Sequence, residues 1–122
     1  MKQELINWLN NIQKNDGIPP IEVIAFNFGI YESEAGYKIY FVGSFEYDEN
    51  DDDWACIEMP TESHRYFDLP KELQIKDSDE ILTICAKSLT ELEKEGNLKI
   101  DLLKNAIAIT IGFDEGELIK IR

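Results

Sequence analysis

The sequence predicts an α+β fold in which a mostly antiparallel sheet of about five strands carries two helices packed on one face. Apolar residues recur at helical spacing in residues 3–14 and again after Asp77, whereas they alternate with polar residues in residues 21–31 and 37–47. Helices and strands do not alternate as in repeated β-α-β units, which argues against a parallel sheet. The 122 residues, 43% of them hydrophobic, are predicted to form a single domain spanning residues 1–122.

The first predicted helix covers residues 3–14, and its apolar face carries Leu5, Ile6, Trp8, Leu9 and Ile12. Residues 15–20 read Asn-Asp-Gly-Ile-Pro-Pro, a run that ends a helix. Residues 21–31 then predict a half-buried strand, with Ile24, Phe26, Phe28 and Ile30 on one side. The short polar tract 32–36 ends in glycine and leads into the second alternating segment, so these two strands are predicted to form an antiparallel hairpin.

Residues 54–59 predict a third strand that stops at Pro60. Alternation in this strand turns one of two sets of side chains inward: either Trp54 with Cys56, or Ala55 with Ile57 and Met59. The second set is more uniformly apolar, and its burial would leave Trp54 partly exposed. Residues 61–76 show no clear period and predict an irregular connection, with a short edge strand as the alternative.

A second helix is predicted to begin after Asp77, because Asp-Ser-Asp-Glu places a capping residue and negative charge at a helix start. Its apolar face carries Ile81, Ile84, Cys85, Leu89 and Leu92, and Gly96 is a natural stop. Residues 97–104 are ambiguous between a loop and a further helical turn. Residues 106–113 and 118–121 predict two strands joined by a turn at Asp114-Glu115-Gly116.

The negative charge of the chain is concentrated in one segment. The formal net charge is -13, and residues 39–64 supply -8 of it, since they hold eight Asp or Glu and no Lys or Arg. Residues 46–53 read Glu-Tyr-Asp-Glu-Asn-Asp-Asp-Asp and are followed directly by Trp54. A concentrated field of this kind favours a basic partner. It argues against nucleic acid or an anionic membrane as the partner, because binding to phosphate requires Lys and Arg.

Three interpretations of this acidic segment remain open. It could be a solvated hairpin connection whose charges prevent edge pairing. It could be a calcium site, since residues 48–52 place oxygen ligands at alternating positions, although no glycine follows for the sharp turn. It could be a docking surface, in which carboxylates beside Tyr47 and Trp54 combine electrostatic steering with aromatic anchors. The docking surface is the favoured interpretation.

No motif in the sequence predicts catalysis, and no metal or cofactor is expected. His64 is the only histidine and has no recognisable nucleophile nearby in sequence, and the glycines are too scattered for a phosphate loop. Cys56 and Cys85 lack metal-site spacing and are expected to be buried free thiols. The first 12 residues lack the features of a signal peptide, and no apolar run approaches the roughly 20 residues of a membrane helix. A cytoplasmic protein without contact to membranes is therefore predicted.

Two segments carry a resemblance to a known family. Tyr-Phe-Val-Gly-Ser-Phe-Glu-Tyr-Asp at residues 40–48, with Asp-Asp-Asp-Trp-Ala-Cys at 51–56, resembles a pattern in immunity proteins of bacterial polymorphic toxin systems, which are similar to contact-dependent inhibition systems. Residues 108–118 are similar to the closing hairpin of such proteins, and together these segments cover about a quarter of the chain. The resemblance implies a protein that is not an enzyme and that binds and neutralises one cognate toxin, often a nuclease. It carries over no catalytic residues.

The leading hypothesis is an immunity-type protein that binds a cognate toxin protein, expected to be basic, through its acidic segment. The acids would set the association rate and the tryptophan the lifetime of the complex. The candidate partner-binding residues are Glu46, Tyr47, Asp48, Glu49, Asp51, Asp52, Asp53 and Trp54. The alternative is a small scaffold or regulatory domain that binds a protein through its sheet and uses the acids only for solubility. A third class, a small hydrolase using carboxylates, would require a concave site.

Overall fold

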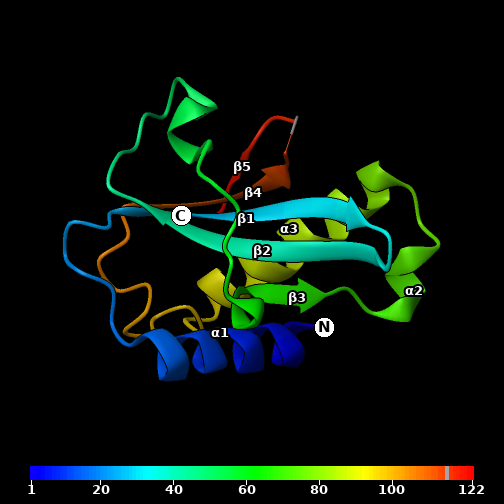
Figure 1. The fold of residues 1–122 in the computed structure, drawn as a ribbon, viewed down its shortest axis with the longest axis horizontal. Helices are drawn as coiled ribbons and strands as arrows, with labels where there is room; N and C mark the ends of the chain where they lie inside the picture. The colour runs from blue at the N-terminus through cyan, green and yellow to red at the C-terminus, as the bar shows by residue number, and fades with distance from the viewer. Residues whose placement is uncertain (115) are drawn as a thin grey trace.

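The computed structural model describes residues 1–114 and 116–122 and has the predicted α+β class (Figure 1). Within these residues, one five-stranded sheet has the order β3-β2-β1-β4-β5. The strands are β1 (Ala25–Ser33), β2 (Gly36–Ser44), β3 (Tyr66–Asp68), β4 (Ala108–Phe113) and β5 (Ile119–Lys120). The helices are α1 (Lys2–Asp16), α2 (Lys71–Gln74) and α3 (Ser78–Lys94), and two 3₁₀-helices are η1 (Asp52–Ala55) and η2 (Ser63–Arg65).

The sheet is mostly antiparallel, as predicted, but its central pair is parallel. The β1–β2 hairpin pairs Ala25 with Ser44, and the short edge strands β3 and β5 are antiparallel to β2 and β4. In contrast, β1 and β4 run parallel, with Ala25 opposite Ala108 and Ile30 opposite Phe113. The connection through α3 returns the chain to the far side of β1, which allows this parallel pairing.

The two long helices form where the sequence predicts, although α1 begins one residue before and ends two residues after the predicted range 3–14. α1 ends at Gly17, whose φ of 77° lies in the left-handed region that glycine adopts readily. The Asp77 carboxylate accepts a hydrogen bond from the backbone N–H of Glu80 and so caps α3. Gly96, with a φ of 79°, lies just beyond the end of α3. Local capping and apolar periodicity therefore determine both elements.

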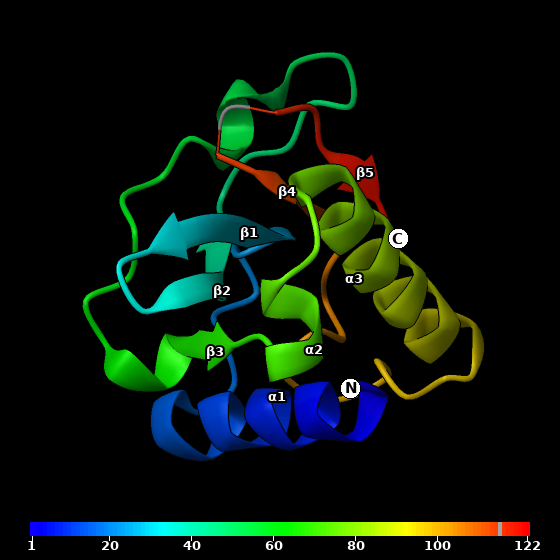
Figure 2. The ribbon, with the colours of Figure 1, turned by 90° about the vertical axis from the view of Figure 1, so that its right-hand side faces the viewer.

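The main hydrophobic core joins both long helices to one set of alternate strand residues. Trp8 of α1 packs beside Phe28 and Phe41, with ring centroids 6.0 and 6.4 Å apart. Figure 2 shows α1 below the strands and α3 to their right, with the connection between β2 and β3 on their left and above. We call this side of the sheet the helix-covered face; its strand residues are Phe26, Phe28, Ile30, Ile39, Phe41, Ile109 and Ile111.

The opposite side of the sheet, which we call the open face, carries smaller and more polar residues. Ala25 and Ala108 pack against Trp54 in a separate small cluster. Gly29 lies under the ring of Tyr40, and a Cβ there would be 2.1 Å from the Tyr40 Cζ atom. The Tyr40 ring therefore lies across the sheet only because position 29 has no side chain. The segment between β2 and β3 covers part of this face.

The prediction of a third strand at residues 54–59 is wrong. The first two of these residues complete η1, and the backbone from Cys56 to Met59 is irregular. The acids ahead of Trp54 explain the difference, because the Asp51 carboxylate caps η1 by accepting a hydrogen bond from the backbone N–H of Asp53. The β2 edge that such a strand would need is instead paired with β3, the short edge strand of residues 61–76.

The two cysteines differ from each other in burial. Cys56 is exposed, so its predicted burial is wrong, since the strand that would have turned it inward does not form. Cys85 is buried in α3 as predicted, and burial raises the pKa of its thiol to about 12. The turn predicted at residues 114–116 includes Glu115, which lies outside the described residues.

Candidate partner-binding surface

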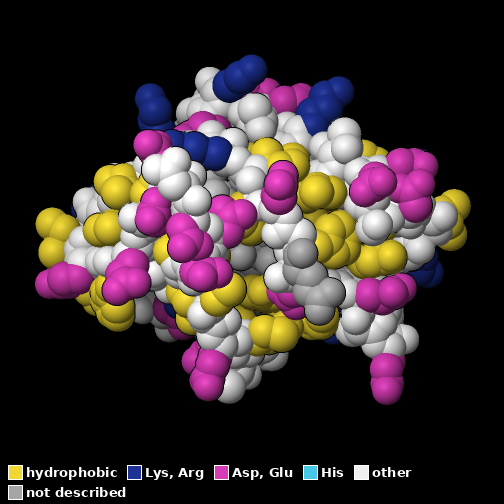
Figure 3. All heavy atoms as spheres, turned by 90° about the horizontal axis from the view of Figure 1, so that it is seen from above, with side chains coloured by type: hydrophobic (Ala, Val, Ile, Leu, Met, Phe, Trp, Pro, Cys, Tyr) yellow, Lys and Arg dark blue, Asp and Glu magenta, His cyan; other side chains and the backbone are white. Residues whose placement is uncertain are grey.

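The predicted acidic segment follows β2 and runs into the first half of η1; we call it the acidic loop (residues 46–53). All of its carboxylate side chains are exposed, whereas Tyr47 is partly buried. In Figure 3, Asp and Glu side chains gather on the face seen from above, with hydrophobic side chains between them. Lys and Arg side chains lie mainly along the upper margin of this view. Four of the loop acids, Glu46, Asp48, Asp51 and Asp53, line one recess together with Tyr47 and Trp54.

Three of the acids hold the loop in shape. The Asp48 carboxylate accepts a hydrogen bond from the backbone N–H of Asn50 at 2.9 Å. Asp51 caps η1, and Asp52 accepts from the backbone N–H of Leu118 at 3.2 Å. These bonds tie the loop to itself and to the chain leading into β5.

The remaining acids of the loop are available to a partner. In the part of the chain that the structure describes, the carboxylates of Glu46, Glu49 and Asp53 make no hydrogen bond or ion pair. Their charges are exposed and lie in the same loop as the structural acids. The loop therefore contains two kinds of carboxylate, one that builds its conformation and one that faces solvent.

Trp54 is buried, with 8% of its surface exposed, so the expectation of a partly exposed tryptophan is wrong. Its indole packs against Ala25 and Ala108, and the Tyr47 ring meets it edge-on at 5.3 Å. Its backbone oxygen accepts a hydrogen bond from the Ser44 hydroxyl at 3.3 Å. Two alanines on neighbouring strands leave room for the indole, and Trp54 thereby anchors the loop to the open face.

A cleft of about 450 Å³ lies beside the acidic loop, above the open face. Asn27 and Tyr40 come from the sheet, and the remaining lining comes from η1, the residues after it and the end of β4. Its walls contain both apolar and acidic side chains. The wall residues are Asp52, Asp53, Ala55, Cys56, Ile57, Met59, Phe113, Asp114, Gly116 and Leu118.

Sequence reasoning missed the apolar part of this cleft. Ile57 and Met59 are 37% and 39% exposed, although strand alternation predicted that they face inward. The signal was present as an apolar run next to the acids, but its interpretation depended on a strand that does not form. Asp114 was missed as well, because only the fold brings the end of β4 to the acidic loop.

The polar groups on the floor of the cleft are engaged with their neighbours. The Tyr40 hydroxyl donates a hydrogen bond to the Asp114 carboxylate. Burial, together with this bond and the Asp114 charge, raises the pKa of Tyr40 well above its usual range. Asn27 is 4% exposed, and its side-chain oxygen accepts a hydrogen bond from the Thr110 hydroxyl at 2.9 Å. The floor of the cleft is therefore hydrogen-bonded internally and lies below walls that are acidic and apolar.

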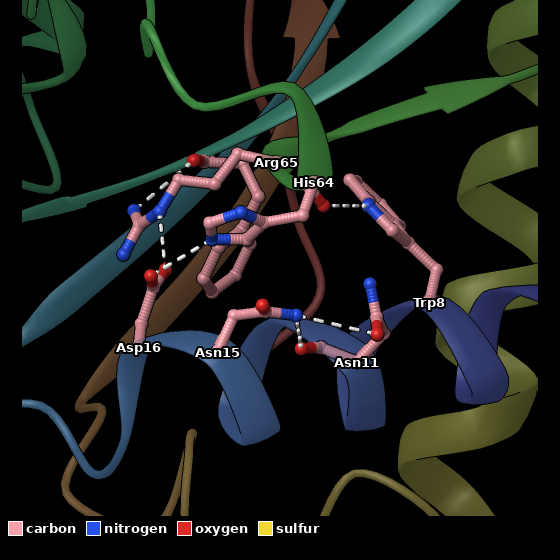
Figure 4. Close-up of polar contacts among 7 residues, drawn as sticks. Trp8, Asn11, Asn15, Asp16, His64 and Arg65 are labelled. Atoms are coloured by element: carbon pink, nitrogen blue, oxygen red, sulfur yellow. Dashed lines mark hydrogen bonds and ion pairs between the residues drawn. The ribbon is translucent and has the colours of Figure 1, made fainter.

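The only histidine takes part in a structural contact away from the acidic loop (Figure 4). The Asp16 carboxylate, at the end of α1, pairs with His64 Nε2 and Arg65 Nε, each at 2.8 Å. The indole N–H of Trp8 donates to the backbone oxygen of His64 at 2.9 Å. Burial raises the pKa of Asp16, but the hydrogen bonds and charges of Arg65 and His64 outweigh it, so the pKa is lowered. These contacts attach η2 to α1.

Within the described residues, no group of three or more His, Cys, Asp or Glu is arranged to hold a metal ion. No helix there is both long enough and apolar enough to cross a membrane. Comparison of the chain with protein-family models, with curated proteins and with solved structures finds no match.

Proposed function

We propose that the chain is an immunity-type protein that binds and neutralises a basic, nuclease-like toxin domain in the cytoplasm, without catalysis. One observation carries this proposal: exposed carboxylates stand on a structured loop at the rim of an open cleft. The walls of that cleft include the exposed apolar residues Ile57 and Met59. A surface that combines acids with apolar side chains is complementary to a protein that presents Lys and Arg around an apolar patch.

Electrostatics supports this choice of partner. A nuclease that grips phosphates must present Lys and Arg, and an acidic protein can cover that surface. Residues 39–64 supply -8 of the formal charge of -13, so the field is directional. Such a field raises the rate of encounter with a basic protein, and that rate falls as salt rises. Rapid capture is what neutralisation of an intracellular toxin requires.

The scaffold alternative, in which the acids serve only solubility, predicts weak salt dependence. One observation fits it in part, because Asp48, Asp51 and Asp52 already have partners within the protein. Substitution of these three acids would therefore disturb the conformation of the loop as well as its charge. Substitution of Glu46, Glu49 and Asp53 changes the charge of the loop without disturbing its conformation, because these carboxylates face solvent.

The partner is identified first. The tagged chain is incubated with a lysate of its native host at low and high salt, and the retained protein is identified by mass spectrometry. The gene of that protein is then expressed with and without this chain. We expect a basic protein that is released as salt rises, that is lethal alone and that is tolerated when the chain is present. A neutral protein held equally at both salts would contradict the proposal.

The role of the loop is tested by a charge-matched pair of variants. The loop variant carries Glu46→Gln, Glu49→Gln and Asp53→Asn. The control variant carries Glu32→Gln, Glu34→Gln and Glu72→Gln, which removes the same charge from exposed positions outside the acidic loop, at the end of β1, in the β1–β2 turn and on α2.

Association with the purified partner is measured by stopped flow over a range of salt. The loop variant should associate about tenfold more slowly at low salt and show a flatter salt slope, while the control changes little. If both variants associated equally slowly, net charge alone would determine the association rate. If the loop variant associated at an unchanged rate, the acidic loop would not be part of the interface.

A further inference from the structure

Three apolar residues form a row across the ends of the central strands. The backbone N–H of Ile24 donates to Ser44 O at 2.9 Å, and that of Ile107 donates to Ile24 O at 2.7 Å. These bonds lie just beyond the last paired residues of the sheet, where Ala25 is opposite Ser44 and Ala108. Ile24 therefore lies between Ser44, which directly precedes Phe45, and Ile107, and we call Ile24, Phe45 and Ile107 the apolar row.

Two residues of the apolar row are open to solvent. Phe45 is 69% exposed and Ile107 is 59% exposed, whereas Ile24 is partly buried. The loop before β1 adds Ile18 and Ile21, which are 54% and 71% exposed.

The figures place these segments together. Figure 1 shows this loop, the end of β2 and the start of β4 together at the left end of the molecule. Hydrophobic side chains gather at the same end in Figure 3, next to Asp and Glu side chains. Grouped apolar residues with this much exposure mark a contact surface.

The apolar row is continuous with the acidic loop. Phe45 directly precedes Glu46, the first residue of that loop. Ile24 also lines a recess of about 570 Å³ together with Glu46, Tyr47, Asp48, Asp51, Asp53 and Trp54. One surface thus combines an apolar part with a charged margin. This composition is typical of protein–protein interfaces.

We infer that the apolar row is the anchor that holds the basic partner, the role that the sequence assigned to Trp54. This inference rests on the proposed function, because it names the residues that keep the same partner bound after the acids have attracted it. The occupant is a protein with an apolar patch flanked by Lys and Arg. A second copy of this chain is disfavoured, because it would bring another acidic loop and another net charge of -13 to the same surface.

The test compares two variants of exposed apolar residues. The row variant carries Phe45→Ser and Ile107→Ser. The control carries Ile75→Ser, because Ile75 is 89% exposed but lies between α2 and α3, away from the row. Melting curves of both should match that of the unsubstituted chain. The probe is the basic protein that the unsubstituted chain retains from the host lysate, purified as a recombinant protein.

The row variant should bind this probe about 100-fold more weakly, mainly through faster dissociation, with little change in association rate or salt slope. The control should bind within about twofold of the unsubstituted chain. If the row variant dissociated at an unchanged rate while the loop variant still associated slowly, the apolar row would not be the anchor. The proposed function would be unaffected by that result. Failure of the unsubstituted chain to retain any basic protein would overturn both.

Sedimentation of the chain alone tests whether a second copy of the chain binds to the apolar row. The unsubstituted chain should remain monomeric as its concentration rises, because like charges repel. A dimer that forms with concentration and is lost in the row variant would assign the row to a second copy and overturn the inference.

Discussion

The two faces of the sheet differ in what their side chains do. The helix-covered face presents large residues such as Phe28 and Phe41, which are fully buried under the helices. The open face presents alanine, glycine and a hydrogen-bonded Asn27–Thr110 pair, and a connecting segment covers only part of it. Large buried side chains stabilise the fold, whereas small ones leave the concave space that a partner can enter. The closed core therefore lies on one side of the sheet and the open cleft on the other.

The strongest test of this division compares truncations on the two faces. Phe41→Ala should lower the free energy of unfolding by about 3–5 kcal/mol, because it leaves a cavity in the closed core. Trp54→Ala should lower it by about 2 kcal/mol, since Trp54 borders two water-accessible recesses and its removal creates no closed cavity. Denaturant unfolding measures both. Equal losses would contradict this division, because the open face would then contribute as much to stability as the helix-covered face.

A second test adds a methyl group to the open face. Gly29→Ala places a Cβ against the Tyr40 ring, so the ring must move and the Tyr40–Asp114 hydrogen bond is lost. We expect a loss of about 1–3 kcal/mol and a fall in the Tyr40 pKa toward its ordinary value, followed by ultraviolet titration.

Gly116→Ala is the matched control for that substitution, because a Cβ there would meet no atom closer than 3.8 Å. Its stability and tyrosine titration should match those of the unsubstituted protein. A Gly29→Ala protein with unchanged titration would show that the floor of the cleft is adaptable rather than rigid.

The smallest expected effect concerns an ion pair at the end of α3. Arg122 Nη2 donates to Glu93 Oε1 at 2.9 Å, and Arg122 Nη1 donates to Leu103 O at 2.7 Å. The hydrogen bond from Arg122 lowers the pKa of Glu93 below its ordinary value of 4.5. The resulting stabilisation is complete above pH 4.5 and is lost as the pH falls through the lowered pKa.

Glu93→Gln should therefore reduce stability by about 1 kcal/mol at neutral pH and make the loss of stability below pH 4.5 shallower. Thermal melting between pH 3 and 7, compared with Glu91→Gln on the same helix, measures this difference. If both variants lost stability in parallel with the unsubstituted protein as the pH fell, the Glu93–Arg122 pair would not contribute to acid sensitivity.

Elements specified by local signals were predictable from the sequence. α1, α3 and the β1–β2 hairpin follow from apolar period, capping residues and turn glycines. The parallel pairing of β1 with β4 was not predictable, because it depends on where α3 returns the chain. Ala25 and Ala108 carry no signal of that pairing in their local sequence. Tertiary packing decides such contacts, and local pattern does not.

The candidate site was predictable in part for the same reason. The exposed carboxylates of the acidic loop follow from composition, and the structure places them together. Trp54 was misjudged because its environment, two alanines on separate strands, exists only after folding. Phe45 belongs to the alternating segment 37–47, but alternation does not reveal which of its apolar residues the rest of the chain leaves exposed.

The parallel pairing of β1 and β4 also determines how the chain reaches its fold. More than half of the chain lies between these two strands, so during synthesis β1 is completed long before its partner. Until then the β1 edge is unpaired, and another nascent chain could pair with it. Non-local pairing of this kind slows folding. The acidic loop follows β2 directly, so each nascent chain already carries its densest negative charge while that edge is exposed, and the charge keeps neighbouring chains apart.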